Sequence, residues 1–186
     1  MFLPSAVFAQ DYAPVEVFGG LSVMRVGQMD DKDGRLVLSS GGMSGWGASV
    51  AFNLNPSWAV KADFSGQYTG IEGLKNVNLG RHNILGGVQY NMRYSSFNVF
   101  FEGLAGLTSY GLNGDNVRDN ANFKGLGIAG GGGVDWKFSD RFSWRVAQMN
   151  YTFAKVGNRD YPGNPIEGAK AGGFRFQTGI LINLGN

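Results

Sequence analysis

Apolar and polar residues alternate along most of the chain. In WAVKADFSGQY, residues 58–68, every second residue from Trp58 to Tyr68 is apolar or small, and Lys61 and Asp63 lie between them. A period of two is typical of a β-strand whose two faces meet different surroundings. Eight segments share this pattern, and none shows a sustained helical period. They span approximately residues 14–26, 43–54, 58–69, 81–92, 97–109, 123–138, 141–153 and 172–184.

The connections between these segments alternate in length. The short ones are NPS at 55–57, RYSS at 93–96 and SDR at 139–141, and the long ones occupy about 27–42, 70–80, 110–122 and 154–171. Consecutive hairpins of this kind put all short turns at one end of a sheet and all long loops at the other, as in outer-membrane barrels. Segment 141–153 loses its alternation at AQMNYTF, which indicates a β-bulge.

The aromatic residues bear on which strand face points inward. Those on the apolar face that lie beside the short turns are Trp58, Trp136, Phe138, Phe142 and Trp144. Tyr90 occupies the same face close to RYSS. Such a belt is typical of a lipid–water interface. We therefore expect the apolar face to contact lipid and the other face to point inward.

The opposite face carries charged residues in mid-strand. They are Lys61, Asp63, Glu102, Arg145 and Arg175, and glycine fills much of the remaining face. On the outside, a basic residue at the bilayer midplane would cost about 2–4 kcal/mol. Inside a small barrel, glycine leaves room for long side chains from neighbouring strands, and opposite charges can pair. We predict that these five residues form an interior ion cluster.

These patterns predict an all-β fold. It is an eight-stranded antiparallel up-and-down transmembrane β-barrel with short periplasmic turns and four long external loops. A lipocalin-like cup also has eight up-and-down strands, but it needs an apolar lumen, and the sequence offers no second apolar face to line one. Glycine accounts for 31 of the 186 residues, more than twice its average share of about 7%, which suits a crowded interior.

The chain divides into a short N-terminal segment and one domain. Residues 1–10 look like the remnant of a secretory signal peptide or a flexible N-terminus, with Val7 and Ala9 at the −3 and −1 positions of a cleavage site. Residues 11–186 form the single barrel domain. Cysteine is absent, which excludes a disulfide framework, and the net charge of +2 does not favour nucleic acid as a partner.

Several stretches together carry a resemblance to a known family: VEVFGGLSVMR, GWGASVAFNLNPSWAVKADFSGQY, RHNILGGVQY, GGGVDWKFSDRFSWR and FQTGILINLG. Over about residues 14–185, their order and spacing resemble the bacterial outer-membrane β-barrel domain family, which includes outer membrane protein A-like and opacity-type barrels. The resemblance implies the cell outer membrane as the location, with its lipid and its assembly machinery as partners. Gln177, Gly179, Ile182 and Leu184 resemble the β-signal read by that machinery, although this chain ends in LGN rather than an aromatic residue.

These features favour a non-enzymatic barrel with a structural or surface-interaction role through its external loops and a lumen plugged by charged residues. The alternatives are a narrow passive channel or small-ligand binder and, less favoured, an enzyme that modifies lipid A. The only histidine, His82, shares the lipid-facing parity of Ile84 and Val88 and has no serine within two residues. The DDKDG stretch at 30–34 lacks the terminal glutamate of a calcium loop, so we expect no metal or cofactor. The sequence does not identify an external ligand.

Overall fold

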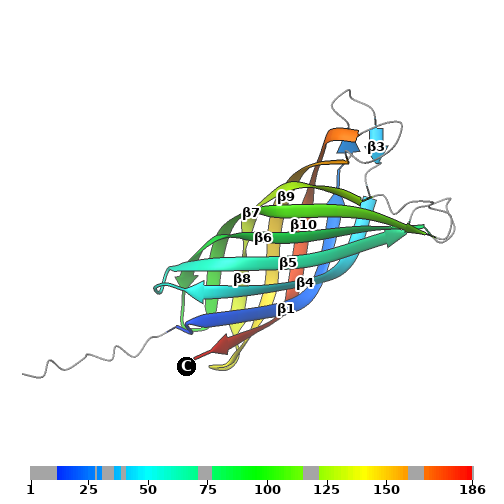
Figure 1. Ribbon diagram of the computed structural model, residues 1–186. Helices are drawn as coiled ribbons and strands as arrows, with labels where there is room; N and C mark the ends of the chain where they lie inside the picture. Colours follow the sequence, from blue (N-terminus) through cyan, green and yellow to red (C-terminus); the bar gives the residue numbers. More distant parts are fainter. Residues whose placement is uncertain are drawn as a thin grey trace, which may run out of the picture.

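Successive residues along each long strand point to opposite faces of one closed β-sheet. The computed structural model describes residues 12–27, 29–30, 36–38, 41–70, 77–114, 122–158 and 166–185. The barrel strands are β1 (Val15–Val26), β4 (Gly41–Asn53), β5 (Trp58–Gly70), β6 (Val77–Arg93), β7 (Phe97–Gly114), β8 (Asn122–Lys137), β9 (Phe142–Asn158) and β10 (Ile166–Leu184) (Figure 1). Two short strands, β2 (Met29–Asp30) and β3 (Leu36–Leu38), are additional.

The barrel strands pair antiparallel with their sequence neighbours, and the first and last close the sheet. The order is β1-β4-β5-β6-β7-β8-β9-β10, and β10 pairs back onto β1 from Val15 opposite Leu184 to Val26 opposite Gly173. Closure leaves no unpaired strand edge, which is what a spanning sheet requires in lipid. The predicted eight-stranded up-and-down barrel is confirmed.

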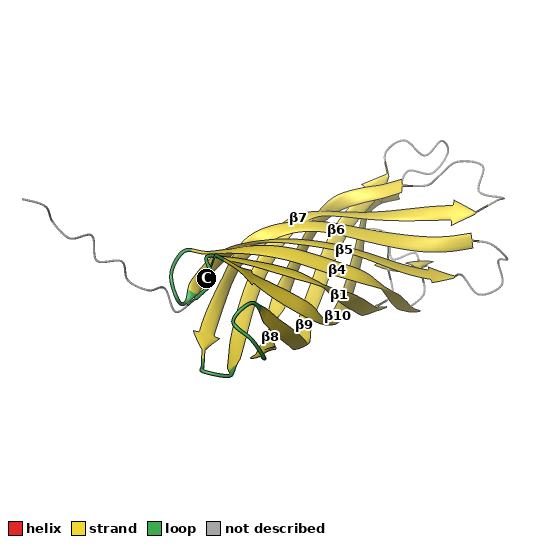
Figure 2. Cartoon of the chain, turned by 90° about the horizontal axis from the view of Figure 1, so that it is seen from below, coloured by secondary structure: helices red, strands yellow, loops and turns green. Residues whose placement is uncertain are grey.

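Side chains in the short turns fix their backbone locally. Asn55 Oδ1 accepts hydrogen bonds from the backbone N–H groups of Ser57 and Trp58, and Ser139 Oγ accepts one from that of Phe142. Asparagine and serine favour such turns because their side chains bond to nearby backbone. These turns gather at the end of the barrel where the C-terminus lies (Figure 2).

The structure has a bulge in β9 one residue before the stretch AQMNYTF in which the sequence predicts it. Val134 pairs with Ala147, and Asp135 pairs with Arg145, so Val146 has no partner of its own in β8. The same irregularity appears towards β10 between Gln177 and Gly179. The extra residue shifts the alternation of β9 by one position. The side chains after the bulge therefore face the same way as those opposite them on the neighbouring strands.

At the loop end, four strands extend further than the sequence pattern predicts. β6, β7, β9 and β10 run four to six residues beyond the expected segments. In this extension the apolar residues change face: Lys155 and Lys170 point outward and are exposed, whereas Val156 and Ala169 are buried inside. About 9–11 residues cross a bilayer, so these ends stand beyond the lipid, where water favours the reverse arrangement. That reversal blurs the alternation in the sequence.

Large apolar side chains cover the outer face. Trp58 stacks edge-on against Tyr90 at 5.0 Å between ring centroids, and Trp136 lies 6.5 Å from Trp144. Phe138 and Phe142 are also exposed beside their turn. The described residues include no helix long and apolar enough to cross a membrane.

A second group of outward aromatics lies towards the loop end. Tyr68 is ten residues beyond Trp58 on β5, which at about 3.3 Å per residue and a tilt of about 40° is about 25 Å along the barrel axis. Tyr151 and Phe174 pack edge-on at 5.2 Å. The separation matches the height of a lipid-facing band, about 25 Å. The sequence interpretation did not assign this second belt.

Candidate functional site

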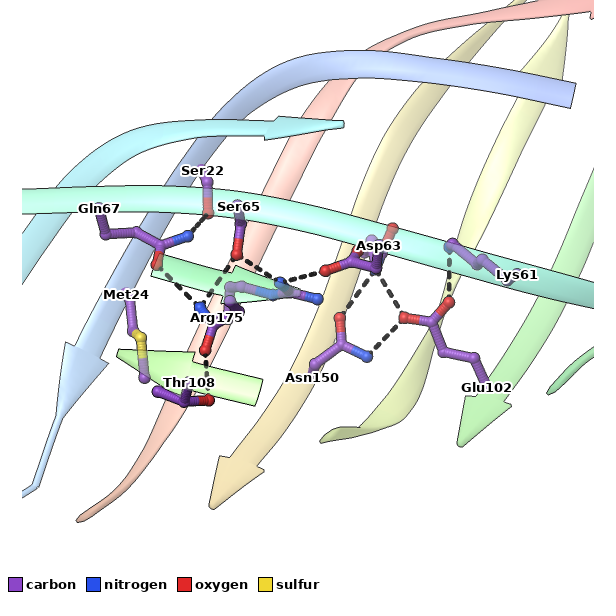
Figure 3. Close-up of polar contacts among 12 residues, drawn as sticks. Ser22, Met24, Lys61, Asp63, Ser65, Gln67, Glu102, Thr108, Asn150 and Arg175 are labelled. Carbon is purple, nitrogen blue, oxygen red and sulfur yellow. Dashed lines mark hydrogen bonds and ion pairs between the residues drawn. The ribbon is translucent and has the colours of Figure 1, made fainter. Parts of the chain in front are cut away.

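The candidate site is the charged interior. The five residues of the predicted ion cluster all point inward, and none is more than 7% exposed: Lys61, Asp63, Glu102, Arg145 and Arg175. They are divided between two networks, of which Figure 3 shows the Lys61–Glu102 and Asp63–Arg175 pairs.

The first network runs across four strands. Lys61 Nζ lies 2.6 Å from Glu102 Oε2. Gln148 donates to Glu102 Oε1 at 2.7 Å and accepts from Arg145 Nη1 at 2.8 Å. Arg145 also binds both carboxylate oxygens of Asp135, at 2.7 and 3.1 Å. Charge-assisted bonds of this two-pronged kind hold both partners in one geometry.

Two inward aromatic rings enclose the Arg145 guanidinium. Its Cζ lies 4.4 Å from the centroid of Phe100 and 4.6 Å from that of Phe18. Glycine makes room for these rings: a Cβ on Gly133 would lie 2.7 Å from the Phe100 ring, and one on Gly20 would lie 2.9 Å from Phe18. The interior glycines thus allow cation–π contacts in a narrow space.

The second network joins β5 to β10. Arg175 Nη1 donates to Asp63 Oδ1 at 2.7 Å and to Ser65 Oγ at 2.9 Å. Ser65 also accepts from Asn83, whose carbonyl accepts from Thr108 at 2.9 Å. Figure 3 shows these side chains meeting inside the barrel.

A fourth ion pair lies at the short-turn end. Arg93 Nη2 is 2.9 Å from Glu16 Oε1, and Asn53 donates to the same oxygen at 2.8 Å. Both charged residues line a cavity of about 870 Å³ that opens beside the turns. The sequence interpretation missed Glu16, although the alternation in VEVFGG assigns it to the inward face.

The interior is apolar towards the loop end. The buried residues that pack together there are Met24, Val26, Met43, Leu79, Tyr110, Ala154, Val156, Ala169 and Ala171. The sequence interpretation found no inward apolar surface. The sequence interpretation missed these residues because several lie in the strand extensions at the loop end, where the apolar side chains point inward instead of outward.

The remaining candidates lie on the barrel wall or outside the described residues. His82 is exposed on the outer face, with its ring 5.5 Å from that of Tyr68. In the β-signal-like stretch, Gln177 points into the lumen, whereas Ile182 and Leu184 point outward. Residues 31–35, most of DDKDG, and residues 1–10 lie outside the described residues. Within the described ranges, no group of three or more histidine or acidic residues is arranged to hold a metal ion.

Gly179 occupies the seam where the barrel closes. It pairs with Gly20 of β1, and a Cβ on either residue would overlap the backbone of the other strand. Only glycine fits at this approach of the two strands.

Solved structures with low sequence identity share this fold. The crystal structure of Neisserial surface protein A (NspA) is 10% identical with a TM-score of 0.65, covering 92% of this chain and 98% of that chain. Ail, the attachment invasion locus protein of Yersinia pestis, solved with the heparin analogue sucrose octasulfate, is 13% identical with a TM-score of 0.54, covering 91% and 99%. Outer membrane protein OprG from Pseudomonas aeruginosa is 13% identical with a TM-score of 0.54, covering 93% and 96%. No family model and no curated protein matches the chain. The fold is that of bacterial outer-membrane β-barrels, as the sequence predicts.

Removing one partner of the Lys61–Glu102 pair tests the first network. We expect Lys61→Met to lower the free energy of unfolding by about 3–5 kcal/mol, because it leaves Glu102 buried without a counter-charge. Adding Glu102→Gln should recover much of this loss, since glutamine still accepts from Gln148 and Asn150. Urea unfolding in lipid vesicles measures both effects.

The matched control for this pair is Lys124→Met, which removes an exposed lysine from the outer face of β8. We expect it to change stability by less than about 0.5 kcal/mol. Equal losses for Lys61→Met and Lys124→Met would contradict the buried pair.

Proposed function

We propose that the protein is a non-enzymatic barrel of the bacterial outer membrane, with a structural or surface-interaction role through its external loops and a lumen plugged by charged and polar side chains. One observation carries this proposal. The Asp63–Arg175 and Glu16–Arg93 pairs each join strands three positions apart in the barrel order of eight. Such pairs span almost the whole width of a barrel this small, in which side chains fill the interior.

The apolar cluster at the loop end supports the same proposal. It adds a dry layer above the ion pairs, so a hydrated ion crossing the lumen would have to displace both charged and aliphatic side chains. Side chains therefore disfavour an open solute pathway at two levels of the barrel, that of the ion pairs and that of the apolar cluster.

The exposed position of His82 argues against the enzyme alternative. Its ring packs against Tyr68. Ser109 lies opposite His82 in register on β7, but none of the hydrogen bonds and ion pairs among the described residues joins His82 to a serine or an acidic side chain. A general base needs such a partner within hydrogen-bond reach.

A small-ligand binder is the second candidate, and the cavity at the short-turn end favours it. Glu16 Oε2 and Asn98 Oδ1 are buried acceptors in the residues lining this cavity, and neither has a hydrogen-bond partner among the described residues. A periplasmic molecule with N–H donors would satisfy both oxygens.

A basic patch on the outer wall supports a direct interaction with lipid headgroups. Arg25, Lys124, Lys155 and Lys170 are exposed and point outward at the loop end of four adjacent strands. Lys155 and Lys170 are directly opposite in register, and Lys170 pairs on its other side with Asp30 of β2. Facing like charges destabilise a sheet. The phosphates of outer-leaflet glycolipid would reduce this repulsion.

The last strand supports recognition by the assembly machinery. Ile182 and Leu184 are exposed on the outer face of β10, and Gln177 has no hydrogen-bond partner for its amide among the described residues. The folded barrel uses the Gln177 amide in no hydrogen bond of the described residues, which supports a role for this residue during assembly.

The plugged lumen predicts no steady conductance. In planar bilayers containing the wild-type protein, we expect at most small, rare openings. Replacing the pair that crosses the lumen, Asp63→Ala with Arg175→Ala, should make openings more frequent, because it removes a barrier of side chains. A steady current through the wild-type barrel would contradict the proposal.

The basic patch predicts stabilisation by lipopolysaccharide. Vesicles that contain it should raise the unfolding temperature more than phosphatidylcholine vesicles do. The double variant Lys155→Gln/Lys170→Gln should lose most of this difference, whereas Arg141→Gln in a short turn should keep it. Equal responses from the two variants would count against headgroup binding at the patch.

The assembly signal predicts a defect in cells without a defect in refolding. We expect Leu184→Asn to reduce the amount of barrel in the outer membrane several-fold, yet to refold normally into detergent. Ile180→Asn, also outward on β10 but outside the motif, is the matched control. The signal is excluded if both variants assemble equally well in cells.

A further inference from the structure

The interior charges do not balance. Each of four buried carboxylates, on Glu16, Asp63, Glu102 and Asp135, pairs with one basic side chain. Arg81 is a further arginine, only 1% exposed, that points inward from β6. Among the described residues, no carboxylate lies within ion-pair distance of it.

The neighbours of Arg81 are all neutral. Its Nε donates to Asn83 Oδ1 at 3.2 Å, and its Nη1 donates to the sulfur of Met24 at 3.1 Å. Its guanidinium lies over the Tyr110 ring, 5.2 Å from the centroid. A thioether is a weak acceptor and a ring face carries no net charge. These contacts orient Arg81 without neutralising it.

Arg175 lies on the other side of Asn83. Asn83 donates to Ser65 Oγ, which also accepts from Arg175 Nη1, so one asparagine and one serine link the two guanidinium groups. The Nε and Nη2 of Arg175 and the hydroxyl of Tyr110 are buried without a hydrogen-bond partner in the described part of the chain. The region thus combines two positive charges, one carboxylate and several unused donors.

A buried charge without a counter-charge is strongly unfavourable. Lumenal water could satisfy the donors, but it would not cancel the charge. Met24 and Tyr110 also belong to the apolar cluster, which covers this region on the loop side. Arg81 therefore faces a neutral, largely dry surrounding in which an anion would be held firmly.

We propose that Arg81, Arg175 and the Tyr110 hydroxyl form a buried site for a small inorganic anion, chloride in the first instance. The site lies between the ion networks and the apolar cluster. Met24, Asn83 and Tyr110 all contact the Arg81 guanidinium directly. This close packing favours a single-atom anion over an organic acid.

Chloride dependence of stability tests the site. The purified full-length barrel in detergent is unfolded by heat in sodium chloride and in sodium gluconate at equal ionic strength. We expect chloride to lower the unfolding equilibrium constant of the wild type by a factor that grows with its concentration, about tenfold at ten times the dissociation constant. Arg81→Gln should remove the response, while Arg141→Gln, which deletes an exposed charge in a short turn, should retain it.

Crystals of the wild-type protein soaked in sodium bromide provide a measurement that does not depend on a variant folding. We expect an anomalous peak between the guanidinium groups of Arg81 and Arg175. The proposal is overturned if no peak appears there, if wild-type stability is the same in chloride and gluconate, or if Arg81→Gln keeps the full chloride response.

Discussion

An eight-stranded barrel encloses a space only wide enough for its own side chains, and the rest of this structure depends on that constraint. Charged residues that point inward lose most of their water, so each must find an opposite charge or a dense set of hydrogen bonds. Lys61, Arg145 and Arg175 do so with carboxylates at 2.6–2.7 Å. The aromatic rings around Arg145 fit because glycine occupies the wall behind them.

The same constraint explains the division along the barrel axis. Within the height of the lipid, large apolar residues cover the outward face and most of the polar and charged residues face inward. Beyond the outer aromatic belt the arrangement reverses, with Lys155 exposed and Val156 buried. One β-sheet thus presents apolar side chains to lipid along part of its height and charged side chains to water beyond it. The change occurs at the level where the basic patch begins.

The alternation predicts most of the fold and the direction of the charged side chains, because a period of two determines the face of each residue. It does not determine which inward residues meet. Arg145 binds Asp135 on the neighbouring strand, and Asp63 reaches Arg175 across the lumen. Such pairings depend on the bulge in β9 and on how the closing strands are staggered. Phe18 and Phe100 share the inward parity of Glu16 and Glu102, so the alternation places them inside, but it does not predict that both rings meet Arg145.

The central claim is that the face carrying Lys61 and Asp63 is inside and the face carrying Trp58 and Phe64 meets lipid. The chain lacks cysteine, so single cysteines can be introduced from 58 to 68 and spin-labelled in lipid vesicles. Oxygen accessibility should alternate with a period of two, high at the even-numbered positions and low at the odd-numbered ones. The opposite phase, or no alternation, would contradict the claim.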